Sequence, residues 1–111
     1  MNKDPFAIRL ESKGVVRLSG RLDASQAGKA KAFLEPFSEP LVLDFTDLDY
    51  ISSAGVGTCL GALEDIQARG GSLTLAGLKE NVRHVFELLG FLKIVVEHPT
   101  AAAALAKVPP Q

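Results

Sequence analysis

The chain has 111 residues, of which 47% are hydrophobic and 23% are charged, and its formal net charge is −1 at pH 7. These values are typical of one globular domain with an ordinary hydrophobic core. A net charge so close to zero provides no basic surface for nucleic acid or an anionic membrane, and no apolar run approaches the roughly 18 residues of a membrane span.

Two alternating segments at the start of the chain predict a β-hairpin at a sheet edge. Apolar residues recur with period two in both segments, and the short sequence Ser-Lys-Gly separates them. The apolar positions are Phe6, Ile8 and Leu10 in the first segment and Val16 and Leu18 in the second.

The next two elements are a helix and a buried strand. After Asp23 the apolar spacing lengthens to three and four, which predicts an amphipathic helix that ends before Pro40. Asp23 or Ser25 is placed to accept hydrogen bonds from its first amides. The continuous apolar run PLVLDF, residues 40–45, then predicts a strand covered on both faces. The helical apolar positions are Ala27, Ala30, Phe33, Leu34 and Phe37.

The second half of the chain begins with an expected loop over residues 47–53, which leads into a second helix ending at Gly70 and Gly71. The remaining segments predict a strand over 72–77, a helix over 79–90 with Gly90 as its C-terminal cap, a strand over 91–97 and a short helix over 99–108. The inward positions of the second helix are Val56, Cys59, Leu60, Leu63 and Ile66.

The resulting order, β-β-α-β-α-β-α-β-α, is that of a single α/β domain over residues 1–111. The alternation of strands and helices predicts parallel strand pairs with right-handed crossovers beside the N-terminal hairpin, and therefore a mixed sheet. We expect the core of the domain to extend over residues 6–106 and residues 107–111 to form a frayed tail. The first ten residues contain no long apolar segment, so we expect no signal peptide and a cytoplasmic location.

Three glycines near the start of the second helix invite comparison with nucleotide-binding loops. Gly55, Gly57 and Gly61 have the spacing G-x-G-x-x-x-G, one residue longer than the dinucleotide fingerprint. The following strand, over 72–77, does not end in the acidic residue that this fingerprint requires, and the G-K-[ST] of a P-loop is absent. These observations argue against nucleotide binding.

Catalytic and metal sites are as poorly supported. Ser52 and Ser53 follow a strand and precede a helix, as a hydrolase nucleophile would, but the pattern G-x-S-x-G is absent. The two histidines, His84 and His98, fall in a helix and in a turn, and with scattered acids they give no metal-ligand spacing. Cys59, the only cysteine, is expected in the core. We therefore expect no enzyme activity, no cofactor and no metal.

The serines and glycines at the start of the second helix permit two interpretations. Either Ser52 or Ser53 would serve as the N-cap, which requires only one hydroxyl. Two glycines inside the helix cost it roughly 2 kcal/mol relative to alanine. Small residues occupy one side of the helix, namely Ala54, Gly57, Thr58 and Gly61. They either allow close packing against the protein's own sheet or form a smooth surface for a partner. The pattern alone does not distinguish these two interpretations.

Three stretches of the sequence resemble the STAS domain of bacterial anti-sigma factor antagonists. They are GRLDA at 20–24, LVLDFTDLDYISSAGVG at 41–57 and GGSLTLAGLKENVRHVFELLGFLKIV at 70–95, and the resemblance covers nearly the whole chain. Its central motif is a strand followed by an aspartate, a hydrophobic pair, a serine, a small residue and a glycine. The resemblance implies a STAS-type mixed sheet with helices packed mainly on one face.

In this family, the serine at the helix start is phosphorylated by a partner kinase of the histidine-kinase-like ATPase superfamily, which is also an anti-sigma factor. The unphosphorylated antagonist binds that kinase and thereby releases a sigma factor, and a PP2C-type phosphatase restores this form. The resemblance makes Ser53 the phosphorylated residue, with Ser52 as second choice because it stands where other members often have aspartate. The resemblance associates the loop that contains Asp47 with partner contact and favours the docking interpretation of the small residues. We therefore expect partner contacts at Asp23, Asp47, Asp49, Ser52, Ala54, Gly55, Gly57, Thr58 and Gly61.

Elementary electrostatics is compatible with such a switch. A phosphate adds about −1.5 to −2 charges, and the free amides of a helix start tolerate an anion. If the second and third strands are parallel, Asp23, Asp47 and Asp49 surround the phosphate with like charges. An acidic partner surface is then repelled, and we expect the binding free energy to weaken by about 1–3 kcal/mol. Each acid also has a simpler explanation, Asp23 as a helix cap and the other two as turn residues.

Two other functions remain open. The first alternative is a constitutive STAS subunit of a transport or signalling assembly, in which the serine is only a cap. The second, more remote alternative is a small serine hydrolase, which requires a histidine near Ser52 or Ser53. Phosphorylation of Ser53 by a kinase separates the first alternative from the switch, and esterase turnover that depends on Ser53 would support the second.

Overall fold

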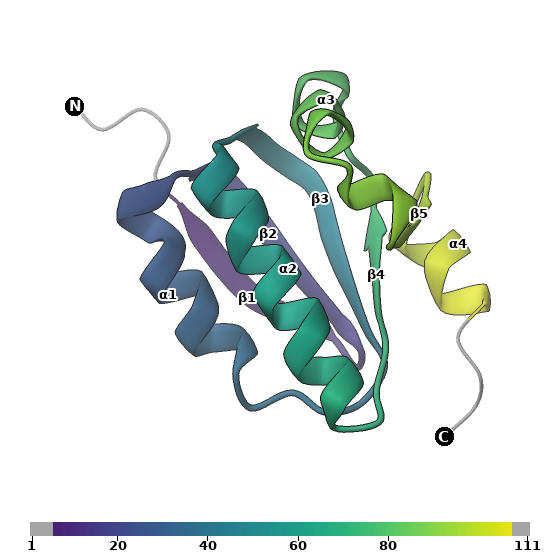
Figure 1. Ribbon diagram of the computed structural model, residues 1–111. Coiled ribbons are helices and arrows are strands. Elements are labelled where there is room, and N and C mark those ends of the chain that lie inside the picture. The colour runs from purple at the N-terminus through teal and green to yellow at the C-terminus, as the bar shows by residue number, and fades with distance from the viewer. Residues whose placement is uncertain (1–5, 108–111) are drawn as a thin grey trace.

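The computed structural model describes residues 6–107, which form a five-stranded sheet flanked by helices (Figure 1). The strands are β1 (Ala7–Ser12), β2 (Val15–Leu22), β3 (Leu41–Ile51), β4 (Leu73–Ala76) and β5 (Val96–His98). The helices are α1 (Ala24–Leu34), α2 (Ser53–Ala68), α3 (Glu80–Leu88) and α4 (Ala101–Ala106), with a 3-10 turn η1 (Phe91–Lys93) before β5. The frayed tail expected over 107–111 lies, from residue 108 onward, outside the described residues.

The strand order in the sheet follows the chain, β1-β2-β3-β4-β5. β1 and β2 form the predicted antiparallel hairpin, and the pairs β2–β3, β3–β4 and β4–β5 are parallel. A parallel pair requires a crossover that returns the chain to the other end of the sheet, and α1, α2 and α3 serve as these crossovers. The predicted mixed α/β fold with an N-terminal hairpin is confirmed.

The two faces of the sheet are covered unequally. α1 and α2 lie side by side over one face (Figure 1), and the buried residues of α1, α2 and α3 join the main core with the inward residues of the strands. α4 lies on the opposite face, where Ala104 packs against Val15, Val42 and Ala76. The helices are therefore packed mainly on one face, as predicted. No helix within residues 6–107 is long and apolar enough to cross a lipid bilayer.

The third strand is longer than predicted. The prediction of a loop over residues 47–53 was wrong, because β3 extends to Ile51 and α2 begins at Ser53. β3 continues to Ile51 because β2 provides pairing partners up to the pair of Leu22 with Ile51. With two register shifts in this pairing, Leu48 and Ile51 lie in the core, while Asp47 and Asp49 are exposed. Closely spaced aspartates are typical of turns, and here pairing with β2 overrides that tendency. Asp47 and Asp49 are thus strand residues.

The segment 91–97, predicted as a strand, is one only at its end. Gly90 has a φ of 74° and terminates α3, after which Phe91 turns back onto Phe86 with ring centroids 5.3 Å apart. Phe91 and Val95 are buried in the core, and only Val96–His98 remain in register with β4. Burial of the phenylalanine in a 3-10 turn therefore replaces the first half of the predicted strand.

Candidate interaction site at the start of α2

Ser52 is the N-cap of α2. Its backbone is extended, and its hydroxyl accepts a hydrogen bond from the Gly55 amide at 3.2 Å. Its own amide donates to the Leu22 carbonyl at 2.9 Å, and its carbonyl accepts from the Val56 amide at 3.0 Å. Ser52 therefore joins the end of β2 through its amide to the first turn of α2 through its carbonyl and its hydroxyl.

Ser53 is the first residue of α2, and its side chain is exposed. Within residues 6–107, its hydroxyl has no hydrogen-bond partner. The first amides of a helix have no acceptors in the helix itself and carry partial positive charge, so a negative group attached at this position is electrostatically favoured. Of the two serines, Ser53 is the one whose hydroxyl is available to another molecule.

The glycines of α2 differ in what surrounds them. A Cβ atom on Gly55 would lie 2.7 Å from Cγ1 of Ile51 and 2.8 Å from the carbonyl oxygen of Leu22, so this position requires glycine for internal packing. A Cβ atom on Gly57 or Gly61 would meet no atom within 4 Å. The internal-packing interpretation therefore applies to Gly55, and it does not account for the other two.

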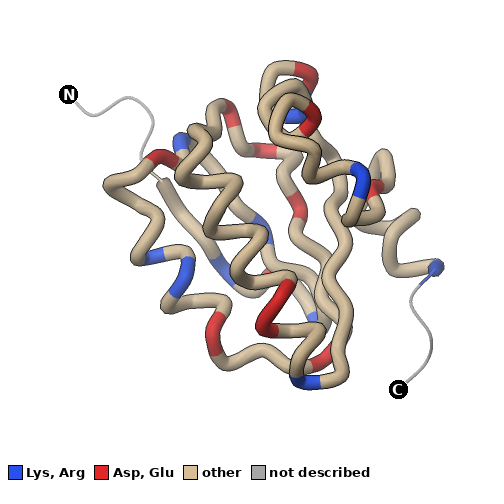
Figure 2. The backbone as a smooth tube through the Cα atoms, in the orientation of Figure 1, with Lys and Arg blue, Asp and Glu red and all other residues tan. Residues whose placement is uncertain are grey.

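Two grooves flank the exposed side of α2, and Gly57 lines both of them. The α1–α2 groove has a volume of about 270 Å³, and the α2–α3 groove has a volume of about 220 Å³. α2 carries no charged residue before Glu64 (Figure 2). The small uncharged residues Ala54, Gly57, Thr58 and Gly61 lie along this side of the helix, and we call this surface the small-residue ridge. The α1–α2 groove is lined by Lys31, Leu34, Glu35, Ala54, Gly57, Thr58, Gly61, Ala62 and Asp65. The α2–α3 groove is lined by Ser53, Val56, Gly57, Leu60, Leu89, Gly90, Phe91 and Ile94.

The α2–α3 groove presents apolar surface beside Ser53. Leu89 is 52% exposed and Ile94 is 59% exposed, although both are large hydrophobic residues. Their neighbour Phe91 is buried, so the groove has an apolar floor and an apolar rim. No local sequence signal connects these residues with Ser53, because they lie more than 30 positions away in the chain. Only the packing of α3 and η1 in the fold brings them beside the start of α2.

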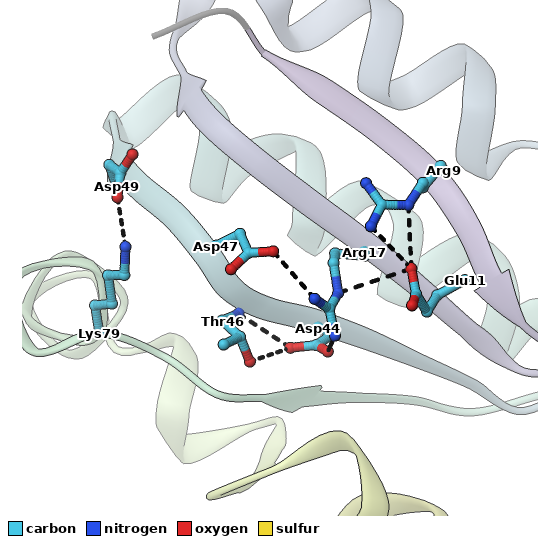
Figure 3. A network of polar contacts seen from close by, with 8 residues as sticks. All are labelled: Arg9, Glu11, Arg17, Asp44, Thr46, Asp47, Asp49 and Lys79. Atoms are coloured by element: carbon cyan, nitrogen blue, oxygen red, sulfur yellow. Dashed lines mark hydrogen bonds and ion pairs between the residues drawn. The ribbon is translucent and has the colours of Figure 1, made fainter.

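The three predicted acids do not all face Ser53, and each has a partner within the fold. Asp23 caps α1, where it accepts from the Ser25 amide at 3.0 Å and the Ser25 hydroxyl at 2.6 Å, and the hydrogen bond from that hydroxyl lowers the pKa of Asp23. Asp47 points to the face of the sheet away from α1 and α2 (Figure 3) and binds Arg17 at 3.0 Å. The expectation of like charges around Ser53 was therefore wrong for Asp47. Asp23 lies at the expected end of the sheet, because it directly follows Leu22, whose carbonyl accepts from the Ser52 amide.

Asp49 is held in an interaction that the sequence did not indicate. Its carboxylate pairs with Lys79 at the N-terminus of α3 (Figure 3), and its carbonyl accepts from Asn81 Nδ2 at 2.8 Å. These contacts join the end of β3 to the start of α3. They also neutralise Asp49, so this acid contributes little negative field at the start of α2.

A buried ion pair occupies the opposite face of the sheet (Figure 3). Asp44 is almost fully buried, and it binds Arg17 Nη2 at 3.0 Å and accepts from the Thr46 amide at 3.0 Å and the Thr46 hydroxyl at 2.6 Å. The charge of Asp44 raises the pKa of Arg17, against the opposing effect of burial, and the hydrogen bond to Asp47 adds to the rise. Arg17, Asp44 and Asp47 therefore satisfy one another's charges, and none of the three is left to bind a charged ligand on that face.

The remaining chemically active side chains lie apart from the start of α2. His84 is exposed on α3, His98 ends β5, and within residues 6–107 neither hydrogen-bonds to Ser52 or Ser53. Burial raises the pKa of the Cys59 thiol to about 12, so it stays protonated. The described part of the chain groups no three His, Cys, Asp or Glu side chains that could hold a metal ion.

Comparison with known families and structures identifies the domain. A model of the STAS domain matches residues 7–104. The chain belongs to the STAS domain family. A Bordetella bronchiseptica relative, provisionally named anti-sigma factor antagonist BtrV, is 35% identical over 105 residues, which cover 89% of this chain and 90% of the relative. The anti-sigma-B factor antagonist of Listeria monocytogenes is 34% identical over 82 residues, which cover 70% of this chain and 72% of the relative.

Solved structures agree with this assignment. The anti-sigma factor antagonist SpoIIAA in its unphosphorylated form has a TM-score of 0.74 at 22% identity, over 93% of this chain and 95% of that one. Bacillus SpoIIAA in its phosphorylated form has a TM-score of 0.67 at 21% identity, over 93% of this chain and 98% of that one. At these identities the likeness shows a shared fold. With the closer relatives, it places this STAS domain protein in the family of anti-sigma factor antagonists, which are regulators and not enzymes.

Proposed function

We propose that this STAS domain protein is a phosphorylation-switched anti-sigma factor antagonist and that Ser53 is its phosphorylated residue. In the unphosphorylated form it binds an anti-sigma factor that is also a serine kinase, and so releases a sigma factor or another effector. A PP2C-type phosphatase returns it to this form. The observation that carries the proposal is the division between the two serines. Ser52 caps α2, and Ser53 presents an exposed hydroxyl that has no hydrogen-bond partner among residues 6–107.

The reaction requires a serine hydroxyl that can reach the γ-phosphate of ATP on the kinase. Ser53 Oγ would attack that phosphorus, the bond to the bridging oxygen would break, and ADP would leave. The serine proton would pass to a base on the kinase. Ser52 is less suited to this transfer, because it is half-buried and its hydroxyl already accepts from the Gly55 amide at 3.2 Å.

A phosphate on Ser53 would act on the surface and leave the core intact. It adds about −1.5 to −2 charges at a helix N-terminus, where an anion is locally tolerated. Because Ser53 lines the α2–α3 groove, the same charge lies at the edge of an apolar surface that includes Leu89 and Ile94. A partner that covers this groove would have to desolvate the phosphate, which opposes binding.

The proposal is tested by capture and labelling. Wild type and the variants Ser53→Ala, Ser53→Asp and Ser52→Ala are immobilised in native lysate, and the captured fraction is supplied with ATP labelled at its γ-phosphate. We expect wild type and Ser52→Ala to retain a kinase and to become labelled at Ser53. Ser53→Ala should retain the kinase without becoming labelled, and Ser53→Asp should lose it.

Two outcomes would contradict this proposal. Equal capture by all variants, with no label on the wild type, would favour a constitutive STAS subunit. Label that maps to Ser52 and persists in Ser53→Ala would move the switch to the capping residue.

A further inference from the structure

β1 is an edge strand, and within residues 6–107 no other strand pairs with its outer side. A strand edge offers free amides and carbonyls and is therefore a template for another strand. Leu10, which the alternation places on the apolar side of β1, is 53% exposed there. Arg9 and Glu11 extend from the other face of the same strand (Figure 3).

The sequence of β1 is complementary to itself in an antiparallel arrangement. When two copies pair about a two-fold axis at Leu10, Arg9 of each copy lies opposite Glu11 of the other, and the two leucines meet at the axis. A register centred on Arg9 would place two arginines opposite each other, and one centred on Glu11 would do the same with two glutamates. Charge therefore favours the register centred on Leu10, which places opposite charges across the seam at two positions.

We propose that this STAS domain protein forms a symmetric dimer through antiparallel pairing of β1 with β1 of a second copy, centred on Leu10. The partner of the edge is thus another copy of the same chain. The sheets of the two copies become continuous across the seam. The proposal is independent of the phosphorylation of Ser53.

The charges on β1 can change partners at little cost. In the single chain, Arg9 pairs with Glu11 at 3.0 Å, with their side chains 55% and 37% exposed, and such exposed pairs contribute little to stability. The register with β2 shifts between Leu10 and Ser12, so Glu11 has no partner residue across β2. Glu11 is therefore held by side-chain contacts alone and is available for pairing with a second copy.

The dimer is weak and leaves the Ser53 site open. A short pair of edge strands buries less than the roughly 1,200 Å² of standard stable interfaces, so it forms only at high protein concentration. The α2–α3 groove is built from α2 and from residues 89–94, which follow α3, and β1 contributes nothing to it. The dimer thus presents two Ser53 sites to partners.

Complementary charge variants test the seam. Sedimentation is measured from about 10 μM to about 1 mM, the range over which weak complexes dissociate. Wild type is expected to approach twice the monomer mass at the upper end. Arg9→Glu alone and Glu11→Arg alone should remain monomeric, since each brings like charges together across the seam. An equimolar mixture of the two should associate again, because the acidic edge of one variant faces the basic edge of the other.

Circular dichroism and thermal melting of each variant serve as controls for folding, which the exposure of both side chains is expected to preserve. A wild type that stays monomeric at the highest concentration would overturn the proposal. So would association of the single variants as strong as that of the wild type, or failure of the mixture to associate, because either result places the contact elsewhere.

Discussion

Ser52 and Ser53 are adjacent in the chain, but within the described residues only the first of them uses its hydroxyl in the fold. The difference arises from the backbone, because Ser52 keeps the extended conformation of β3 while Ser53 is already helical. A cap at either serine fits the sequence pattern equally well, since the pattern does not locate the last extended residue. The end of β3 decides it, through the hydrogen bond of the Ser52 amide to Leu22.

The cap assignment leads to a stability prediction. Ser52→Ala is expected to lower the free energy of unfolding by about 1 kcal/mol, because the Gly55 amide loses its acceptor. Ser53→Ala, the matched control one residue away, should change it by less than about 0.5 kcal/mol. Urea denaturation of both variants measures the difference. Equal losses would contradict the assignment of Ser52 as the cap.

The glycines of α2 provide a second matched pair. Gly55→Ala places a methyl group 2.8 Å from the Leu22 carbonyl and should cost about 1–3 kcal/mol of stability. Gly57→Ala meets open space and should instead stabilise the helix by up to about 1 kcal/mol. Thermal and urea unfolding distinguish the two. If Gly57→Ala also destabilises the protein, this glycine serves internal packing and the small-residue ridge loses its functional interpretation.

At the scale of elements, the hairpin, the four helices and the parallel order were predictable because periodicity and capping residues are local signals. Two segments could not be predicted in this way. β3 continues through its aspartates because β2 pairs with it to Ile51, and the segment after Gly90 turns because Phe91 is buried against Phe86. In both, contacts between distant parts of the chain override the local tendency.

The ion pair between β2 and β3 is likewise a property of paired elements. Arg17 binds both Asp44 and Asp47 at 3.0 Å, but the Asp44 side chain is 2% exposed and that of Asp47 is 49% exposed. Asp44→Asn should therefore cost about 2–3 kcal/mol, because Arg17 loses its buried counter-charge. Asp47→Asn should cost at most about 1 kcal/mol. Urea unfolding of the two variants tests this, and similar losses would mean that burial does not determine the strength of the pair.

At the scale of the whole molecule, the sheet separates two regions with different chemistry. The ridge of α2 and its two grooves lie on the helical face, and the network of Arg17, Asp44 and Asp47 lies on the other (Figure 3). The resemblance to the family selects Ser53 as a candidate from the sequence alone. It did not locate the grooves, because their other walls come from α1 and from residues 89–94, which only the complete fold brings to α2.

This separation predicts how far a charge at Ser53 is felt. In Ser53→Asp, backbone amide chemical shifts should change at the start of α2 and around Leu89 to Ile94, and remain constant near Arg17 and Asp47 across the sheet. The free energy of unfolding should change by less than about 1 kcal/mol, because the helix N-terminus tolerates an anion. Two-dimensional NMR and urea unfolding of wild type and the variant provide both measurements, with Ser53→Ala as the uncharged control. Shifts spread through the core, or a large loss of stability, would mean that the charge acts by loosening the fold, and a surface switch at Ser53 would be the wrong mechanism.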